Sequence, residues 1–226
     1  MVPAIEDFGK PKTPQIRLQL NLPDRPIDEI SRVWFMKEDG TQLVQLQQDR
    51  LVHNWRKTGT EDVYPRYEAI RSSYRSEIEL LESFLAEEGL GVIAPKQCEV
   101  VYVNHIEASQ DWNIHSELDR VLTTWKSEYS DNFLLSPEDV TFNARYRIHD
   151  DSSPIGRLHI QAQPALRNVD QRPLIVLTLT ARGMLPADET GHERIFRFFD
   201  LGRDQIVRGF TSITTPEMHQ FWKRKV

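Results

Sequence analysis

Residues 142–182 read FNARYRIHDDSSPIGRLHIQAQPALRNVDQRPLIVLTLTAR. Apolar residues occupy every second position in three segments of this stretch, at 142–148, 158–162 and 175–181. A period of two is typical of half-buried strands. The connections 150–156 and 164–173 are short enough to join antiparallel neighbours. We therefore predict an antiparallel sheet with one apolar face and one polar face.

The rest of the chain predicts further strands and several helices. Residues 32–37, 41–47 and 51–56 form a three-strand meander with a hairpin turn at 38–40 and a polar link at 48–50. Apolar residues at spacings of three and four predict an amphipathic helix from near Pro65 to Gly89. We also expect strands at 16–22 and 98–106, helices at 116–126 and 189–212, and a short helix capped by Thr215.

The order of these elements predicts the fold class. Strands followed by a helix occur twice, which favours an α+β protein of antiparallel sheets packed against long helices, built as two similar β-meander-plus-helix halves. We expect an irregular lead-in at 1–15, a first half at 16–130 and a second half at 131–226. The polar segment 127–139 is the expected boundary. One continuous domain is the alternative.

Composition excludes several classes of protein. The chain has 226 residues, of which 39% are hydrophobic and 27% are charged, so wholesale disorder is excluded. The longest apolar stretch, 174–179, is too short to span a bilayer. The single cysteine, Cys98, excludes an internal disulfide framework and suits the cytosol. We expect a cytoplasmic protein without a membrane partner, and the net charge of −6 does not favour non-specific DNA binding.

Amide, imidazole and aromatic side chains recur on the meander and on the strand at 98–106. Six of them are candidates for lining a small-molecule pocket: Gln45, Gln47, His53, Trp55, Tyr102 and Asn104. In such a pocket the amides and the imidazole would orient a ligand. The alternative is that these side chains cover a solvated sheet face or satisfy buried backbone groups.

Arginine is concentrated on the polar positions of the three alternating strands. Arg145, Arg147, Arg157 and Arg182 are candidates for an anion-binding surface that would contact phosphate or nucleic acid. Few aromatic residues interleave with them, which does not favour base stacking on single strands. The alternative is a solvated face on which the arginines pair with acids, or a face that a partner covers.

The sequence predicts no catalytic residue, no metal and no cofactor. It contains no G-x-S-x-G, H-E-x-x-H, P-loop or G-x-G-x-x-G motif. His115 and Asp119 lie one helical turn apart, and His149-Asp150-Asp151 lies at a turn, but neither forms a closed ligand set. Nothing near Cys98 would lower the pKa of its thiol.

Four stretches together resemble a sporadically distributed family of uncharacterised bacterial proteins. They are RVWFMKEDGTQLVQLQQDRLVHNWRK (32–57), YPRYEAI (64–70), CEVVYVNHI (98–106) and IVRGFTSITTPEMHQFW (206–222). Members usually carry an additional N-terminal strand and helix before the proline-rich stretch with which this chain begins. The resemblance therefore implies either a naturally short member or a trimmed one, and a missing strand would leave a sheet edge open to a partner or to another copy.

These observations favour a non-enzymatic binding or protein-interaction protein, with a protein partner or a second copy as its ligand. The sporadic distribution that the resemblance implies suits an accessory or defence-type role in bacteria. One alternative is a sensor or enzyme with a polar small-molecule pocket. Another is a nucleic-acid-binding protein that uses the arginine-bearing sheet face.

Overall fold

The structure is a computed structural model that describes residues 32–131, 133–150, 153–184 and 191–224. These residues fall into two compact units, a smaller one at 32–94 and a larger one at 95–224. The elements confirm the predicted α+β class, because antiparallel strands and long helices occur in both units. The lead-in expected at 1–15 and the strand expected at 16–22 lie outside the described residues.

The smaller unit contains the predicted meander and the amphipathic helix. In its described residues the small sheet has the order β1-β2-β3. Its elements are β1 (Val33–Met36), β2 (Gln42–Gln47), β3 (Arg50–Trp55) and α1 (Tyr67–Glu87). The turn between β1 and β2 is held by Asp39, whose Oδ1 accepts hydrogen bonds from the Thr41 amide at 2.9 Å and the Thr41 hydroxyl at 2.6 Å.

Helix α1 packs against β3. The Tyr74 hydroxyl donates a hydrogen bond to the Leu51 carbonyl at 2.9 Å, and the ring of His53 contacts Glu77. Ile78 of α1 is buried. The apolar stripe predicted for α1 therefore covers one face of the small sheet.

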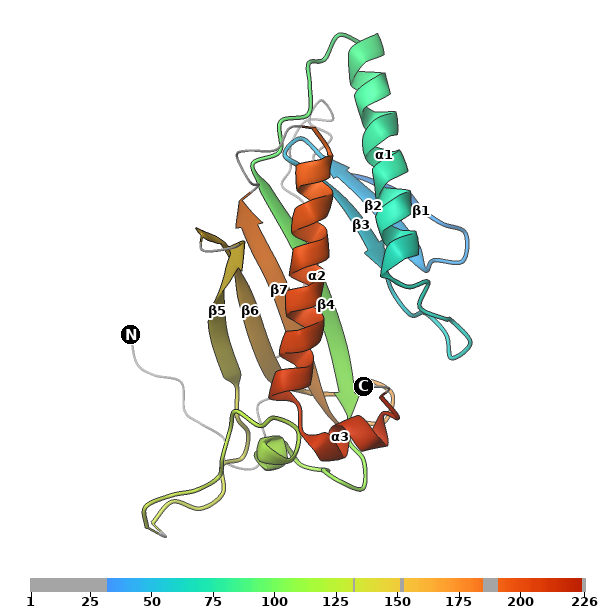
Figure 1. The fold of residues 1–226 in the computed structure, drawn as a ribbon. Coiled ribbons are helices and arrows are strands. Elements are labelled where there is room, and N and C mark those ends of the chain that lie inside the picture. The colour runs from blue at the N-terminus through green and yellow to red at the C-terminus, as the bar shows by residue number, and fades with distance from the viewer. Residues whose placement is uncertain (1–31, 132, 151–152, 185–190, 225–226) are drawn as a thin grey trace, which may run out of the picture. The chain divides into compact units, whose positions relative to one another are not determined.

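The larger unit contains the large sheet, which has the order β4-β7-β6-β5 in the described residues (Figure 1). Its strands are β4 (Gln97–Glu107), β5 (Phe142–Asp150), β6 (Ser153–Leu166) and β7 (Pro173–Met184). Strand β4 pairs with β7 along its whole length, from Gln97 opposite Met184 to Glu107 opposite Leu174. The predicted boundary at 130/131 is therefore wrong, because β4 belongs with the later strands.

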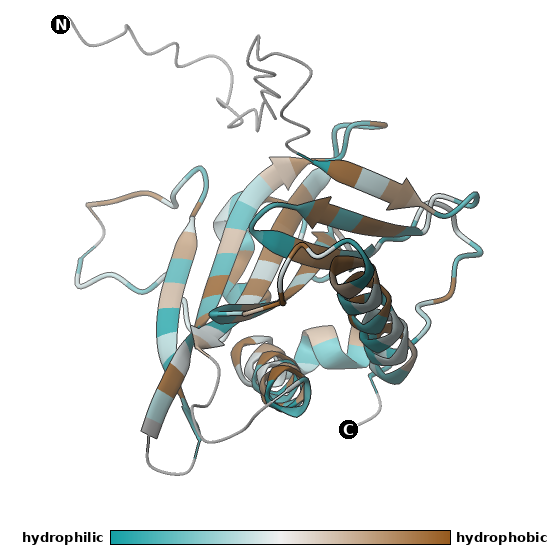
Figure 2. Ribbon diagram, turned by 90° about the horizontal axis from the view of Figure 1, so that it is seen from above, coloured by the Kyte–Doolittle hydropathy of each residue, from teal (hydrophilic) through white to brown (hydrophobic). Residues whose placement is uncertain are grey.

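One face of the large sheet, the inner face, packs against α2 (Glu193–Ile213), as Figure 1 shows. This helix corresponds to the long helix predicted at 189–212. The inner face carries the apolar residues of the alternating strands, and their fully or almost fully buried members are Ile148, Leu158, Ile160, Ala162, Ile175, Leu177, Leu179 and Ala181. Figure 2 shows this alternation as changes between teal and brown along the strands.

Two glycines let α2 approach the sheet closely. A Cβ atom at Gly202 would lie 3.1 Å from the Cβ of Ala181, and one at Gly209 would lie 2.9 Å from the Cδ2 of Leu158. Side chains at these positions would push the helix off the sheet. Helix α2 runs unbroken through Gly202, so this glycine serves close packing.

One predicted helix, at 116–126, is shorter than expected and of a different type. The helix predicted at 116–126 is only a 3-10 helix, η1 (His115–Arg120), because the chain then pairs Leu122 with Thr214 in an isolated bridge. The short helix α3 (Pro216–Phe221) begins as predicted, since the Thr215 hydroxyl caps it by accepting a hydrogen bond from the Met218 amide at 3.4 Å.

Candidate anion-binding face

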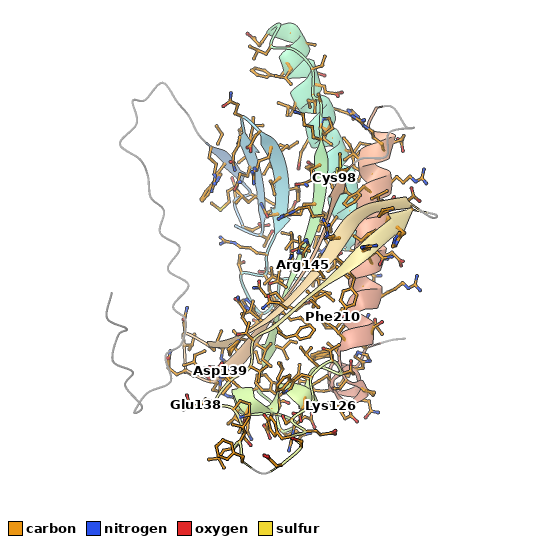
Figure 3. All side chains as sticks on the ribbon, turned by 90° about the vertical axis from the view of Figure 1, so that its left-hand side faces the viewer. Cys98, Lys126, Glu138, Asp139, Arg145 and Phe210 are labelled. Atoms are coloured by element: carbon orange, nitrogen blue, oxygen red, sulfur yellow. The ribbon has the colours of Figure 1, made fainter. Side chains whose placement is uncertain are left out.

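The second face of the large sheet points away from α2, and we call it the outer face. It is built from the residues that alternate with the core, so it carries the polar half of each predicted strand. Its main members are Glu99, Val101 and Val103 of β4, Thr178, Thr180 and Arg182 of β7, Arg157, His159, Gln161 and Gln163 of β6, and Asn143, Arg145 and Arg147 of β5. Figure 3 labels Arg145 on the sheet and Phe210 on α2, and it shows α2 along one side of the large sheet.

The strand register places three arginines side by side. Arg147 of β5 lies opposite Arg157 of β6, and Arg157 lies opposite Arg182 of β7. Neighbouring strands are about 4.8 Å apart, so this arginine row spans about 10 Å. Arg145 precedes Arg147 by two residues and lies on the same face, opposite His159. All four predicted arginines therefore belong to one face, and all four are exposed.

One of the four arginines is neutralised by an acid. Glu99 of β4 lies opposite Arg182 and forms an ion pair with its guanidinium. Within the described ranges, no carboxylate forms an ion pair with Arg145, Arg147 or Arg157. Like charges directly opposite each other destabilise a sheet. The outer face therefore keeps an excess of positive charge at a cost in stability.

The pKa of His159 is lowered by burial as well as by the positive charge of this face. Burial lowers the pKa of the His159 imidazole, and the positive charges of Arg182, Arg145 and Arg157 lower that pKa further, while Glu99 acts in the opposite direction. The protonated imidazole is disfavoured because it would add a fifth cation to the four arginines. A bound anion would reverse this effect.

The polar neighbours of the arginines can form hydrogen bonds with a ligand. Asn143 lies opposite Gln161, and Gln161 lies opposite Thr178, which makes an amide and hydroxyl row next to the arginines. These side chains are exposed or half-buried. In the part of the chain that is described, none of the three has a side-chain hydrogen bond to a protein partner. The alternation of the strands implies that these residues lie on the polar face, but it does not show that they lie opposite one another.

The small sheet places the four pocket residues of β2 and β3 on two different faces. Gln47 lies opposite Arg50 and Gln45 opposite Val52, whereas His53 lies opposite Val44 and Trp55 opposite Gln42. Residues directly opposite each other share a face, so Gln45 and Gln47 lie on one face of the small sheet and His53 and Trp55 lie on the other. A pocket that combines all four is therefore wrong.

The physical reason is the length of the turn between β2 and β3. A three-residue link at 48–50 would have placed Gln45 opposite His53. The turn has only two residues, 48 and 49, and Arg50 already pairs with Gln47. A change of one residue in register moves every side chain of a strand to the other face.

The remaining pocket residues have structural contacts. The amide of Asn104 donates a hydrogen bond to the Leu177 carbonyl at 3.3 Å, and Tyr102 packs against the core of the larger unit. Trp55 contacts Tyr64 with ring centroids 5.1 Å apart. The contact of Asn104 agrees with the alternative interpretation that such side chains satisfy buried backbone groups.

His53 has a partner that the sequence did not reveal. Its Nδ1 lies 2.7 Å from Oε1 of Glu77, and the two side chains are 4% and 21% exposed. The Nε2 of His53 and the Oε2 of Glu77 are buried without a hydrogen-bond partner among the described residues. The two residues are 24 positions apart on a strand and a helix, so no local sequence pattern could have paired them.

The other reactive side chains have structural environments. The Nε2–H of His115 donates to the carbonyls of Ala165 at 2.9 Å and Leu174 at 3.2 Å. Asp150 pairs with Arg197 at 2.7 Å, and Asp151 lies outside the described residues. Burial raises the pKa of the Cys98 thiol to about 12, although Arg194 acts in the opposite direction. An inert thiol agrees with the expectation from the sequence.

The described residues gather no cluster of metal ligands. Among them, no group of three or more His, Cys, Asp or Glu side chains is placed to hold a metal ion. In the same part of the chain, none of the helices combines the length and apolar character needed to cross a bilayer.

Comparisons with protein-family models, with curated protein sequences and with solved structures found no match.

Proposed function

We propose that this protein is a non-enzymatic nucleic-acid-binding protein that contacts the phosphate backbone with the outer face of the large sheet. The observation that carries the proposal is the gathering of four exposed arginines on three neighbouring strands, of which only Arg182 has an acid partner among the described residues. The cytoplasmic location expected from the single cysteine belongs to the same proposal.

Arginine suits this task because its planar guanidinium binds phosphate oxygens with two parallel hydrogen bonds. The arginines are spread over a sheet face, and the row alone spans about 10 Å, given about 4.8 Å between strands. A single phosphate could reach only part of such a surface, whereas a repeating polyanion could contact several arginines at once. Binding would also relieve the repulsion between Arg147, Arg157 and Arg182.

Fluorescence anisotropy with labelled RNA and DNA duplexes tests the proposal. The variant R145Q/R147Q/R157Q removes the three arginines that have no acid partner within the described ranges. The variant R50Q/R120Q/R208Q removes the same charge from exposed arginines elsewhere on the chain. Both variants are checked for folding by circular dichroism before binding is measured.

We expect the outer-face variant to bind at least ten-fold more weakly, and the control variant to bind within about two-fold of the parent protein. The slope of log K against log salt should become shallower by about 0.9 for each phosphate that the variant no longer binds. An equal reduction of affinity in both variants would mean that only net charge matters. Failure of the parent protein to bind any nucleic acid at low salt would also overturn the proposal.

Self-association is a second candidate, because one loop exposes consecutive large apolar residues. Phe133, Leu134 and Leu135 are 86%, 61% and 87% exposed. Asp131 and Glu138 flank them, so contacts between two copies of this loop should strengthen when salt screens the acids. Sedimentation velocity should then show that the fraction of dimer increases with salt concentration in the parent protein and that the variant F133S/L135S forms no dimer. A monomer at all salt concentrations would refute this candidate.

A further inference from the structure

We infer that the nucleic acid bound by the outer face is double-helical RNA. This inference rests on the proposed function and goes beyond it by naming the class of nucleic acid. It starts from the row formed by Asn143, Gln161 and Thr178, which crosses three strands next to the arginines. The adjacent row adds Thr180 opposite His159.

The chemistry of these side chains matches the RNA ribose. An amide offers both donor and acceptor groups, and so does a threonine hydroxyl. The 2′-hydroxyl of RNA is also both a donor and an acceptor, and DNA lacks it. The side chains of Asn143, Gln161 and Thr178 form no hydrogen bond within the described chain, so they are available to bind such a group.

The width of the surface favours an A-form duplex. The polar part of the outer face lies on three strands, β5, β6 and β7, because β4 adds the exposed Val101 and Val103. Two gaps of about 4.8 Å give this part a width of about 10 Å. The major groove of B-DNA is about 12 Å wide and admits a helix or a two-stranded ribbon, and its minor groove is about 6 Å wide. The minor groove of an RNA duplex is wide and shallow and displays the 2′-hydroxyls. A polar face of three strands is broader than the two-stranded ribbon that the DNA major groove admits, so it fits the wide groove of RNA best.

The distribution of charge along the strands agrees with this geometry. The arginine row and the amide row are four residues apart along β5, from Arg147 to Asn143, which is about 14 Å of extended chain. In the bound state the arginines would contact a phosphate strand while Asn143 and Gln161 reach the ribose edge. The two rows would therefore contact different parts of the same duplex.

Single-stranded nucleic acid is disfavoured by the residue types on this face. Proteins that bind single strands stack bases on aromatic side chains. Among the described residues of the outer face there is no Phe, Tyr or Trp, because Phe142 and Tyr146 alternate with its members and point to the inner side. Polar groups without stacking platforms suit a duplex whose bases remain paired.

The test is competition for binding between four ligands of one sequence, about 20 base pairs long so that it exceeds the roughly 16 base pairs that a duplex-RNA-binding domain spans. The ligands are double-helical RNA, double-helical DNA, single-stranded RNA and an RNA duplex with 2′-O-methyl riboses. We expect the RNA duplex to bind at least ten-fold more tightly than the DNA duplex, and 2′-O-methylation to remove most of that advantage.

Two matched variants connect the preference to the amide row. The variant N143A/Q161A should lose the preference for RNA and keep its affinity for DNA within two-fold. The variant N168A/Q220A, which removes one asparagine and one glutamine elsewhere, should keep the preference.

The outcomes separate this inference from the proposed function. Equal binding of RNA and DNA duplexes, or tighter binding of single-stranded RNA, overturns the inference. The proposed function stands in that case if R145Q/R147Q/R157Q still weakens binding. If no nucleic acid binds the parent protein, both fall together. If N143A/Q161A unfolds, which circular dichroism would show, the comparison of the four ligands with the parent protein still decides.

Discussion

The two faces of the large sheet are made from alternate residues of the same strands, and they differ in what they contribute. Leu177, Leu179 and Ala181 of β7 are fully buried under α2, and the residues between them, Thr178 and Thr180, lie on the outer face. The inner face stabilises the fold by removing apolar surface from water. On the outer face, arginines lie directly opposite each other on neighbouring strands, and their repulsion lowers the stability of the fold.

The proposed binding of nucleic acid would give the arginines of the outer face a role that folding does not. A solvated sheet face needs only polar residues, and pairs of opposite charge or threonine would serve it better than adjacent arginines. Natural proteins tolerate such local conflicts mainly at functional sites. The contrast between the faces can be tested by substitutions that distinguish stability from binding.

The largest effect is expected for a substitution on the inner face. Leu179 is fully buried, and Leu179→Ala should lower the free energy of unfolding by about 2 to 5 kcal/mol because it removes buried methyl groups and leaves a cavity. Thr180→Ala, the next residue on the outer face, should change it by less than about 1 kcal/mol. Urea denaturation measures both. Similar destabilisation by the two substitutions would mean that the faces do not differ as described.

A smaller effect of opposite sign is expected in the arginine row. Arg157 lies between Arg147 and Arg182, so Arg157→Thr removes two like-charge pairs and should raise the free energy of unfolding by up to about 1 kcal/mol at low salt. The gain should shrink at about 0.5 M salt, which screens exposed charges. Arg182→Thr is the matched control, because it also breaks the ion pair with Glu99 and should give no gain.

The variant Arg157→Thr also shows whether Arg157 serves binding or stability. If Arg157 serves nucleic-acid binding, Arg157→Thr weakens binding while it stabilises the fold. A variant that loses stability would show that Arg157 packs rather than binds. Urea denaturation and anisotropy on one preparation give both readouts.

The smallest effect is expected from the titration of His159. Its pKa lies below the ordinary value of 6.5, because of burial and the charges of Arg182, Arg145 and Arg157, with Glu99 acting oppositely. As pH falls through 6.5, the unfolded chain takes up a proton that the folded chain resists, so stability declines below that pH. The His159→Gln variant should lack this part of the decline, whereas His105→Gln should retain it.

Bound phosphate should reverse the shift at His159. An anion next to the imidazole favours its protonated form, so binding takes up a proton and nucleic-acid affinity should rise as pH falls from about 7.5 to about 5.5. Anisotropy titrations of the parent protein and His159→Gln over this range measure the effect. An identical pH dependence in both proteins would show that His159 does not contact the bound anion.

Much of the fold could be predicted from local patterns. The alternation at 142–182 predicted three antiparallel neighbours, and the spacing of apolar residues predicted α1 and α2. These predictions are confirmed because a strand or helix with one buried face must repeat its apolar residues with its own period. The prediction of a helix at 116–126 is wrong, since Val121 and Leu122 are buried without a helix that continues beyond η1.

The partners of each strand could not be predicted in the same way. Strand β4 pairs with β7, although β5 and β6 intervene along the chain, and a period of two carries no information about the neighbour. The register of β2 and β3 depended on one residue of turn length, which decided that Gln45 and His53 lie on opposite faces. The contact of His53 with Glu77 likewise exists only in the folded chain.

The sequence by itself determined which residues belong to one face of each strand. Alternation places Arg145 with Arg147 on one side of β5, and Phe142 and Tyr146 on the other, because successive side chains of a strand point to opposite faces. Only the tertiary structure decided that Arg147, Arg157 and Arg182 meet in one row and that Glu99 pairs with the last of them. That arrangement depends on strand order and register, which arise from packing between segments far apart in the chain.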